Sequence, residues 1–274
     1  WELVFAAFTA TSYSTLSSGS GTFTVPDGAN AIHIEASVGG GGGAAGGVSY
    51  DRAGGESAGA GGGSGAFVSD KVFTVTTGET ISYSIGSGGA AGNQTANYGQ
   101  PKTGSAGTNT TLSGSSAGSI YTLAAGGGAS GTGGGVQGPL RTNTSGSAGA
   151  ATINGTAITS GNFRDSDGTT KSVTTLNSGP VGTFNQSGNG TVGANNGNCS
   201  GDNCQIGGSP GGTSYAGNIA GGAGSPQGGS TGGVAGTRGS GGGGGGAQYG
   251  NESVTGRAEA GGAGEIKYRF LRVN

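Results

Sequence analysis

The sequence predicts an all-β protein whose glycine-rich segments form polyglycine II helices, with essentially no α-helix. Three observations support this fold class. Glycine accounts for 72 of the 274 residues, three stretches alternate apolar and polar residues, and glycines near the C-terminal end recur at every third position. Each glycine inside an α-helix costs about 1 kcal/mol relative to alanine, so no segment of this chain is expected to form a stable helix.

The three alternating stretches have the pattern of half-buried β-strands. They comprise residues 22–28 followed by 31–38, residues 66–75 and 81–85 joined by a turn at 77–78, and residues 266–270. In the first stretch, Ile32 and Ile34 share one face, and His33 and Glu35 lie on the other.

Two further signals complete the predicted β-structure. In the closing stretch, Lys267 and Arg269 alternate with apolar residues, which predicts a strand with one apolar and one cationic face. In the middle of the chain, residues 152–153 and 157–158 flank Asn154-Gly155, a dipeptide that suits a type I′ turn. We therefore expect a minor hairpin there.

Glycine-rich blocks lie between the strands, at residues 39–47, 54–65, 126–138, 207–212 and 221–246. In the last block, glycines recur at positions 233, 236, 239, 242 and 245. Three residues per turn is the period of the polyproline II conformation, which makes no hydrogen bonds within its own segment. Segments packed side by side could bond to one another through their amides, because glycine lets the backbones approach closely.

Two other structures are compatible with so much glycine. A disordered Gly/Ser linker is the usual one, because glycine loses the most conformational freedom on ordering. Collagen requires a strict Gly-X-Y repeat, which is absent, and more than the six prolines present. The placement of the blocks between strands and their partly regular spacing favour packed segments.

The order of segments follows a known pattern. Gly-Thr-Phe-Thr-Val-Pro at 21–26 leads through a turn into the strand at 31–38 and then a glycine run, and paired strands follow at 63–68 and 73–86. The chain closes with a glycine run at 241–246 and a strand at 264–270. Over about residues 21–130 and 240–274, this arrangement resembles the glycine-rich domain found at the ends of bacteriophage tail fibres.

The resemblance implies a small antiparallel β-sandwich whose connections form a bundle of packed polyglycine II helices and display variable loops to a host surface. Residues 139–205 depart from the simple pattern of this family. We expect residues 1–20 to form an N-terminal strand and a Ser/Thr-rich linker, and residues 21–274 to form a single glycine-rich domain.

Charge and hydropathy argue against two classes of partner. The formal net charge is −2, only 9% of the residues are charged, and no basic stripe suits phosphates or anionic lipid. No run of the sequence approaches the roughly 20 apolar residues of a membrane span. We therefore expect neither nucleic-acid binding nor membrane insertion. The chain contains no methionine, so we expect a processed mature form or part of a longer protein.

Residues for catalysis are scarce. His33 is the only histidine, so a serine nucleophile has one imidazole available, and we interpret that residue as solvated or packed on its sheet. No lysine follows a glycine, which excludes a P-loop. Asp165-Ser-Asp167-Gly168 resembles the start of a calcium loop but lacks the later acidic ligand, so an ordinary turn is preferred. We expect no enzymatic activity, no cofactor and no metal site.

Cysteines and asparagines offer two candidate modifications. Cys199 and Cys204 are spaced to close a small disulfide loop, and free thiols are the alternative. Asn-x-Ser/Thr triplets are glycosylation candidates, or chance products of a Ser/Thr-rich composition. They begin at Asn93, Asn109, Asn143, Asn154, Asn185, Asn189, Asn198 and Asn251. The triplets favour an extracellular location.

We expect an extracellular structural or adhesive module, and the resemblance favours the receptor-binding tip of a phage-type tail fibre. Rigid scaffolds place binding groups on their connections, and tyrosine and arginine combine contact area with a polar group. The candidates are aromatic and charged residues in otherwise plain surroundings: Tyr50, Arg52, Tyr98, Phe163, Arg164, Tyr215 and Tyr249. The expected partner is a host cell-surface receptor, either protein or glycan.

The alternative is a self-assembling subunit of a secreted surface filament. The apolar residues Trp1, Leu3, Phe5 and Phe8 precede a Ser/Thr/Gly-rich stretch, and segment 1–8 could complete the sheet of a neighbouring copy by strand addition. A homo-oligomer is expected under either hypothesis. A third hypothesis is an ice-binding protein, because flat polyglycine II faces can order water, although the irregular loops of the middle segment argue against it.

Overall fold

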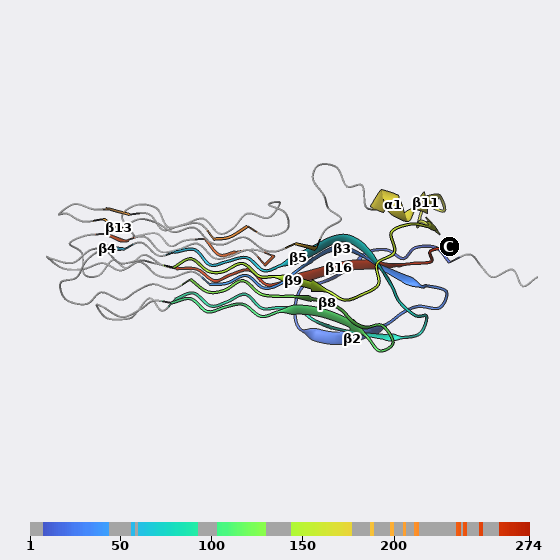
Figure 1. The fold of residues 1–274 in the computed structure, drawn as a ribbon, viewed down its shortest axis with the longest axis horizontal. Coiled ribbons are helices and arrows are strands. Elements are labelled where there is room, and N and C mark those ends of the chain that lie inside the picture. Colours follow the sequence, from blue (N-terminus) through green and yellow to red (C-terminus); the bar gives the residue numbers. More distant parts are fainter. Residues whose placement is uncertain are drawn as a thin grey trace, which may run out of the picture.

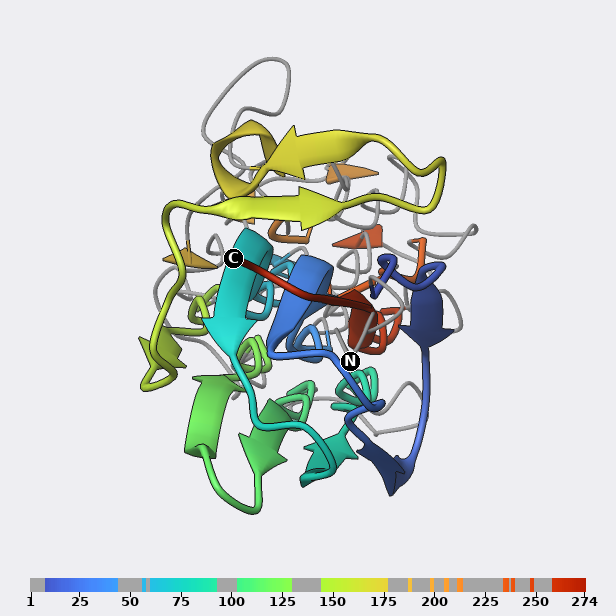
Figure 2. The same ribbon diagram turned by 90° about the vertical axis from the view of Figure 1, so that its right-hand side faces the viewer.

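The computed structural model of the chain describes residues 8–43, 56–57, 60–92, 103–129, 144–176, 187–188, 198–199, 205–206, 211–213, 234–236, 238–239, 247–248 and 258–274. Two β-sheets pack face to face at one end of the molecule, and glycine-rich segments run side by side from this sandwich toward the other end (Figure 1). A hairpin and one helical turn cover the outer face of one sheet (Figure 2).

Both sheets are antiparallel. The first has the order β1 (Ser14–Leu16), β16 (Glu265–Leu271), β3 (Ala31–Val38), β5 (Phe67–Thr74) and β12 (Ser187–Gly188). The second has the order β2 (Ser20–Thr24), β6 (Thr80–Ser84), β7 (Thr110–Gly114), β8 (Gly118–Leu123) and β9 (Ala151–Ile153). The predicted all-β sandwich is confirmed.

Small elements complete the fold. Two-stranded ribbons pair β10 (Asn162–Arg164) with β11 (Thr170–Ser172), β4 (Glu56–Ser57) with β13 (Asn198–Cys199), and β14 (Gln205–Ile206) with β15 (Ala247–Gln248). The one helix of the described residues is α1 (Val173–Leu176), a single turn directly after β11. The expected near-absence of helix therefore holds for these residues.

The core of the sandwich consists of apolar side chains from the facing surfaces of the two sheets. Ile32 and Ile34 of β3 are fully buried there, as the alternation predicts. From the opposite sheet, the Tyr121 side chain is also fully buried, and its hydroxyl donates a hydrogen bond to Ser37 Oγ (3.0 Å). Ser37 rather than Ala36 faces the core because the β3–β16 register shifts opposite Lys267 and Tyr268, as a β-bulge does.

A second, smaller core lies on the outer face of the first sheet. Phe163 of β10 and Val173 of α1 are buried there against strand residues Ala31, Val72 and Leu271. The hairpin β10–β11 and α1 thus form a third layer, above the sheet in Figure 2. His33, on this outer face, is only 1% exposed, so it is packed on the sheet rather than solvated.

The glycine-rich segments are joined by backbone hydrogen bonds that repeat every three residues. Successive amides of residues 39–43 donate to neighbouring segments in turn, and the direction recurs after three residues. The bonds run from Gly39 and Gly42 to Ala66 and Gly63, from Gly40 and Gly43 to Thr108 and Ser105, and from Gly41 to Gly262. A β-strand alternates sides every two residues, whereas a three-residue period is that of polyglycine II. The predicted packing is confirmed.

Segment 39–43 lies at the centre of this bundle. Its carbonyl oxygens accept hydrogen bonds from further segments: Gly40 O from Gly126, Gly41 O from Gly89 and Gly43 O from Ala129. Since both the amides and the carbonyls of this segment bond to other segments, it has no room for side chains. A Cβ at Gly42 or Gly43 would overlap the carbonyl of Gly127 or Ala90, respectively.

The glycine period found in the sequence lies mostly outside the described residues. Its two described members agree with the bundle, because Gly236 donates to Ala260 O (2.9 Å) and Gly239 O accepts from Gly65 (2.8 Å). The bundle also includes segments 86–90, 104–108 and 258–264, which are not among the glycine-rich blocks noted in the sequence.

The predicted hairpin around Asn154-Gly155 is wrong. Both of these amides donate to Ile120 O of β8, at 3.0 and 2.8 Å. The chain then crosses to the other sheet, where Ile158 donates to Val72 O (2.8 Å) of β5. The Asn-Gly step therefore joins β9 to the opposite sheet instead of turning back on it.

The expected N-terminal linker also contains a strand of the sandwich. Ser14–Leu16, within the segment 1–20, form β1 and pair with Tyr268 to Ile266 of β16. Ahead of this strand, Thr11 donates its amide to Phe270 O (3.1 Å). Residues 10–16 therefore follow the edge of β16 along most of its length.

Candidate functional site

The molecule has two distinct ends. The ladder between β3 and β16 runs from Val38 paired with Glu265, where the glycine segments begin, to Ala31 paired with Leu271. The C-terminus and the segment around Thr11, which bonds to Phe270, lie at the end marked by the Ala31–Leu271 pair. We call this the terminal end. The opposite end, where β4 and β13 lie in Figure 1, is called the far end.

Of the residues predicted to bind a receptor, the structure describes two neighbours on β10. Phe163 is 1% exposed and packs in the second core, so the structure corrects its predicted role. Arg164 is exposed, but it lies in the hairpin at the terminal end. The other candidates lie outside the described residues: Tyr50, Arg52, Tyr98, Tyr215 and Tyr249.

Two of these candidates lie in the connection between two segments of the bundle. Segment 39–43 leaves the sandwich from β3, and segment 60–66 returns to it at β5. The connection between them contains Tyr50, Arg52 and β4. It therefore begins and ends on the side of the bundle that faces away from the sandwich.

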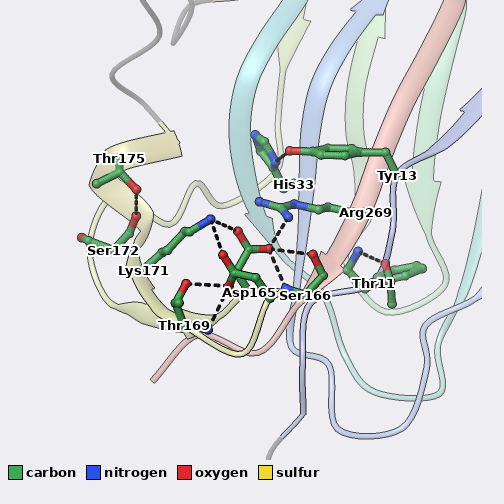
Figure 3. A network of polar contacts seen from close by, with 12 residues as sticks. Thr11, Tyr13, His33, Asp165, Ser166, Thr169, Lys171, Ser172, Thr175 and Arg269 are labelled. Atoms are coloured by element: carbon green, nitrogen blue, oxygen red, sulfur yellow. Dashed lines mark hydrogen bonds and ion pairs between the residues drawn. The ribbon is translucent and has the colours of Figure 1, made fainter.

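A cluster of charged residues, with Asp165 and Arg269 at its buried centre, joins the β10–β11 hairpin to the sandwich (Figure 3). Arg269 of β16 donates from Nη1 to Asp165 Oδ1 (2.7 Å), and both side chains are more than nine-tenths buried. Lys171 of β11 donates from Nζ to Asp165 Oδ2 (2.5 Å). The Arg269 guanidinium lies over the rings of Tyr13 and Phe163, at 4.6 and 5.5 Å from their centroids. We call these residues the hairpin clamp.

The environment of Asp165 favours its ionised form. Burial is the largest single influence and opposes ionisation, but the hydrogen bonds from Lys171, the Ser166 amide and Arg269 together outweigh it. As a result, the pKa of Asp165 is lowered to about 2. The carboxylate is therefore charged throughout the neutral range, and both of its oxygens are occupied by protein donors.

His33 lies beside the hairpin clamp, between two polar partners. Its Nδ1 is 3.1 Å from the Tyr13 hydroxyl, and its Nε2 is 3.3 Å from Asp70 Oδ1. Asp70 has a φ of 45°, in the left-handed region that non-glycine residues rarely occupy. Burial raises the pKa of Tyr13 to about 12 against the opposing effect of Arg269, so its hydroxyl stays neutral.

The chemistry of this cluster is structural. Asp165 has no free oxygen for a substrate, and the imidazole of His33 is 1% exposed. Within the described ranges, no group of His, Cys, Asp and Glu could hold a metal ion. Asp165–Gly168 form a turn, in which Gly168 donates its amide to Asp165 O (2.9 Å).

The structure describes only some of the other predicted site residues. Phe8 packs against the core of its own sandwich, whereas Trp1, Leu3 and Phe5 lie outside the described residues. Of the two cysteines, Cys199 is in β13 and Cys204 lies outside, so the disulfide stays a prediction.

Two of the candidate asparagines are exposed. Asn109 accepts the Ala125 amide (3.0 Å), and Asn154 donates to Ser119 Oγ (3.2 Å). Asn198 is a residue of β13. The other candidates lie outside the described residues: Asn93, Asn143, Asn185, Asn189 and Asn251.

Comparison with protein families gave a match over most of the chain. A family model described as a glycine-rich domain matches residues 15–271. The chain belongs to the glycine-rich domain family. The match covers residues of both sheets, most of the hairpin clamp and the described bundle segments, and it begins within the segment 1–20. Among curated proteins, none matched the chain. In the described part of this glycine-rich domain, no helix has the length and hydropathy needed to cross a membrane.

Proposed function

We propose that this glycine-rich domain is a non-catalytic, extracellular adhesive module, the receptor-binding tip of a phage-type tail fibre. The proposal rests on the difference between the two ends of the molecule. Both described chain ends, around Thr11 and Asn274, lie at the terminal end, and the bundle projects in the opposite direction. A module attached at its terminal end would present its far end to another surface.

The bundle suits this role because its order does not depend on a side-chain core. The central glycine segments are tied to several others by backbone hydrogen bonds, so the connections that leave them start from fixed positions. Recognition would then rest on residues of those connections, such as Tyr50 and Arg52, whose sequence can vary without disturbing the bundle.

Binding of purified protein to a panel of bacterial cells tests the proposal. Combined Tyr50→Ala and Arg52→Ala substitutions are expected to reduce binding severalfold without changing the melting temperature. Arg164→Ala is the matched control, because this arginine is exposed at the terminal end. Loss of binding on Arg164→Ala, with none on the paired substitution, would contradict the proposed direction of presentation.

A second candidate function, the filament subunit, is favoured by one edge of the sandwich. Within the described residues, β2 pairs only with β6, and its sequence Ser-Gly-Thr-Phe-Thr carries no charge. Edge strands are usually protected by charges, proline or bulges, so such an edge suits addition of a strand from another copy. Since Phe8 packs on its own sandwich, a donated strand would consist of the residues before it.

Electron microscopy separates the two candidates. Uniform filaments of purified protein, lost on deletion of residues 1–7, would favour the filament subunit. Single particles that bind cells would favour the tip.

A further inference from the structure

We propose that the module is a directional force-bearing element, which resists pulling between its far end and its N-terminal segment much better than pulling between its two termini. The inference takes from the proposed function only the direction of the load. It depends on how the N-terminal segment is joined to β16.

The N-terminal segment and β16 are antiparallel neighbours. Ser14 and Leu16 pair with Tyr268 and Ile266, and the Thr11 amide donates to Phe270 O (3.1 Å). In return, the Phe270 amide donates to Thr11 Oγ1 (2.9 Å). These contacts are spread along the strand from the terminal end toward the bundle.

The opposite end of β16 is continuous with the bundle. Residues 258–264 lead directly into the strand, and within them Gly261 donates to Gly89 O (2.9 Å) and Gly264 donates to Gly86 O (2.7 Å). Gly262 O also accepts the amide of Gly41 in the central segment. A load on the bundle is therefore passed to β16 through both the chain itself and backbone hydrogen bonds.

The direction of pulling decides how the contacts between the N-terminal segment and β16 are loaded. When the bundle is pulled away from the N-terminus, the two strands slide past each other, and all of these contacts bear load together. When the N- and C-termini are separated, both strands are pulled from the same end, so the contacts at Thr11 and Phe270 break before those at Leu16. The first geometry is shear and the second is unzipping. Forced unfolding is governed by the barrier to unfolding, which sequential rupture lowers.

The polar contacts at the terminal end add to this attachment. The Ala10 amide donates to Arg164 O (2.8 Å) of the hairpin, and the hairpin is held to β16 through Asp165 and Arg269. The N-terminal segment is thus bonded both to β16 and to the third layer.

Single-molecule force spectroscopy on the purified full chain tests the inference without any receptor. One tether is fixed at the N-terminus and the second either at the C-terminus or at an azide-bearing residue replacing Ala106, whose exposed side chain projects from the bundle. Pulling between the N-terminus and this bundle residue, called the far-end geometry because it draws the bundle away from the terminal end, is expected to require severalfold more force. A second handle at Thr103, also exposed, should give the same result. Equal or lower force in the far-end geometry would overturn the inference, and would leave cell binding by the tip unaffected.

A single substitution tests whether the contact between Thr11 and Phe270 bears the pulling force. Thr11→Val keeps the shape of the residue but removes the oxygen that accepts the Phe270 amide, so it should lower the far-end unfolding force. Thr22→Val, at an exposed position of β2, is the matched control and should leave the force unchanged. An unchanged force with Thr11→Val, or an equal drop with both variants, would overturn the assignment of the N-terminal segment as the load-bearing contact.

Discussion

The sandwich and the glycine bundle are stabilised in opposite ways. In the sandwich, large side chains such as Phe73 and Tyr121 fill the space between sheets whose backbones pair only within each sheet. In the bundle, the backbones themselves are the packing surfaces, and the amides of residues 39–43 bond to several neighbours in turn. The hydrophobic effect therefore accounts for the first region, and dense main-chain hydrogen bonding for the second.

The two modes of stabilisation place different demands on the amino-acid sequence of each region. A sandwich position requires a side chain of suitable size, and a nearby size is tolerated at modest cost. A central bundle position requires no side chain at all, because the space for a Cβ is occupied by a neighbouring carbonyl, as at Gly43 and Gly62. One added carbon should therefore cost more in the bundle than one removed carbon costs in the sandwich.

Gly43→Ala should have the largest effect. The new Cβ would overlap the carbonyl of Ala90, and a backbone atom held by its own hydrogen bonds cannot move away cheaply. We expect a loss of at least about 3 kcal/mol in the free energy of unfolding, measured by urea denaturation. Gly78→Ala is the control, because its Cβ would meet nothing within 4 Å and only its φ of 78° is unfavourable. This control should cost about 1–2 kcal/mol, and an equal loss at both positions would contradict close packing of the bundle.

Asp165→Asn should have the next largest effect, because a buried ion pair holds the third layer to the sandwich. The change leaves the Arg269 guanidinium buried without its carboxylate, which should cost about 3 kcal/mol. Asp167→Asn, at an exposed position of the same turn, should leave the free energy of unfolding nearly unchanged.

The same carboxylate gives an acid dependence. Because the pKa of Asp165 is lowered from 3.8 to about 2 on folding, its contribution is complete above pH 3.8 and is lost as the pH falls through about 2. Stability measured across this range should fall less steeply in Asp165→Asn than in the unsubstituted protein. Parallel pH profiles would show that the hairpin clamp does not act as described.

Glu79→Gln should have a smaller effect, on turns of the sandwich. Glu79 is 5% exposed, and its carboxylate accepts the amides of Thr76, Ser116 and Ala117 at 3.0 to 3.2 Å. It thereby ties the β5–β6 turn to the β7–β8 turn. Glutamine keeps one acceptor oxygen and should cost about 1–2 kcal/mol in thermal unfolding. A neutral result would mean that the carboxylate is not needed to hold the two turns together.

Ile34→Val should have the smallest effect and completes the comparison with Gly43→Ala. It removes one carbon from a fully buried core position and should cost about 1 kcal/mol. If it destabilised the protein as much as Gly43→Ala, the two regions would not differ in tolerance.

The parts of the fold that could be predicted are those with a local signal. Alternation placed β3, β5, β6 and β16, and the three-residue spacing of glycines indicated the conformation of the bundle. The signal failed at Asn154-Gly155, where a dipeptide typical of hairpins instead joins the two sheets because both amides bond to Ile120 O. Strands β7 and β8 were also missed, since serine, threonine and glycine dilute their apolar pattern.

Only two parts of the hairpin clamp could be predicted from the sequence. The sequence indicated a cationic face at Arg269 and a turn at Asp165, but these residues are 104 positions apart, and nothing local pairs them. Phe163 is a receptor-binding candidate from the sequence because it is an aromatic residue in otherwise plain surroundings, but it is buried against the sheet. Contacts between distant segments depend on the assembled fold, and sequence patterning alone does not contain them.

Amide hydrogen exchange measures whether the bundle is a body held together by its own backbone. We predict that the amides of Gly40, Gly42 and Gly43 exchange as slowly as those in the centre of β3, since each donates to another segment. Exchange of these amides at the rate of an unstructured glycine peptide, with β3 still protected, would contradict it.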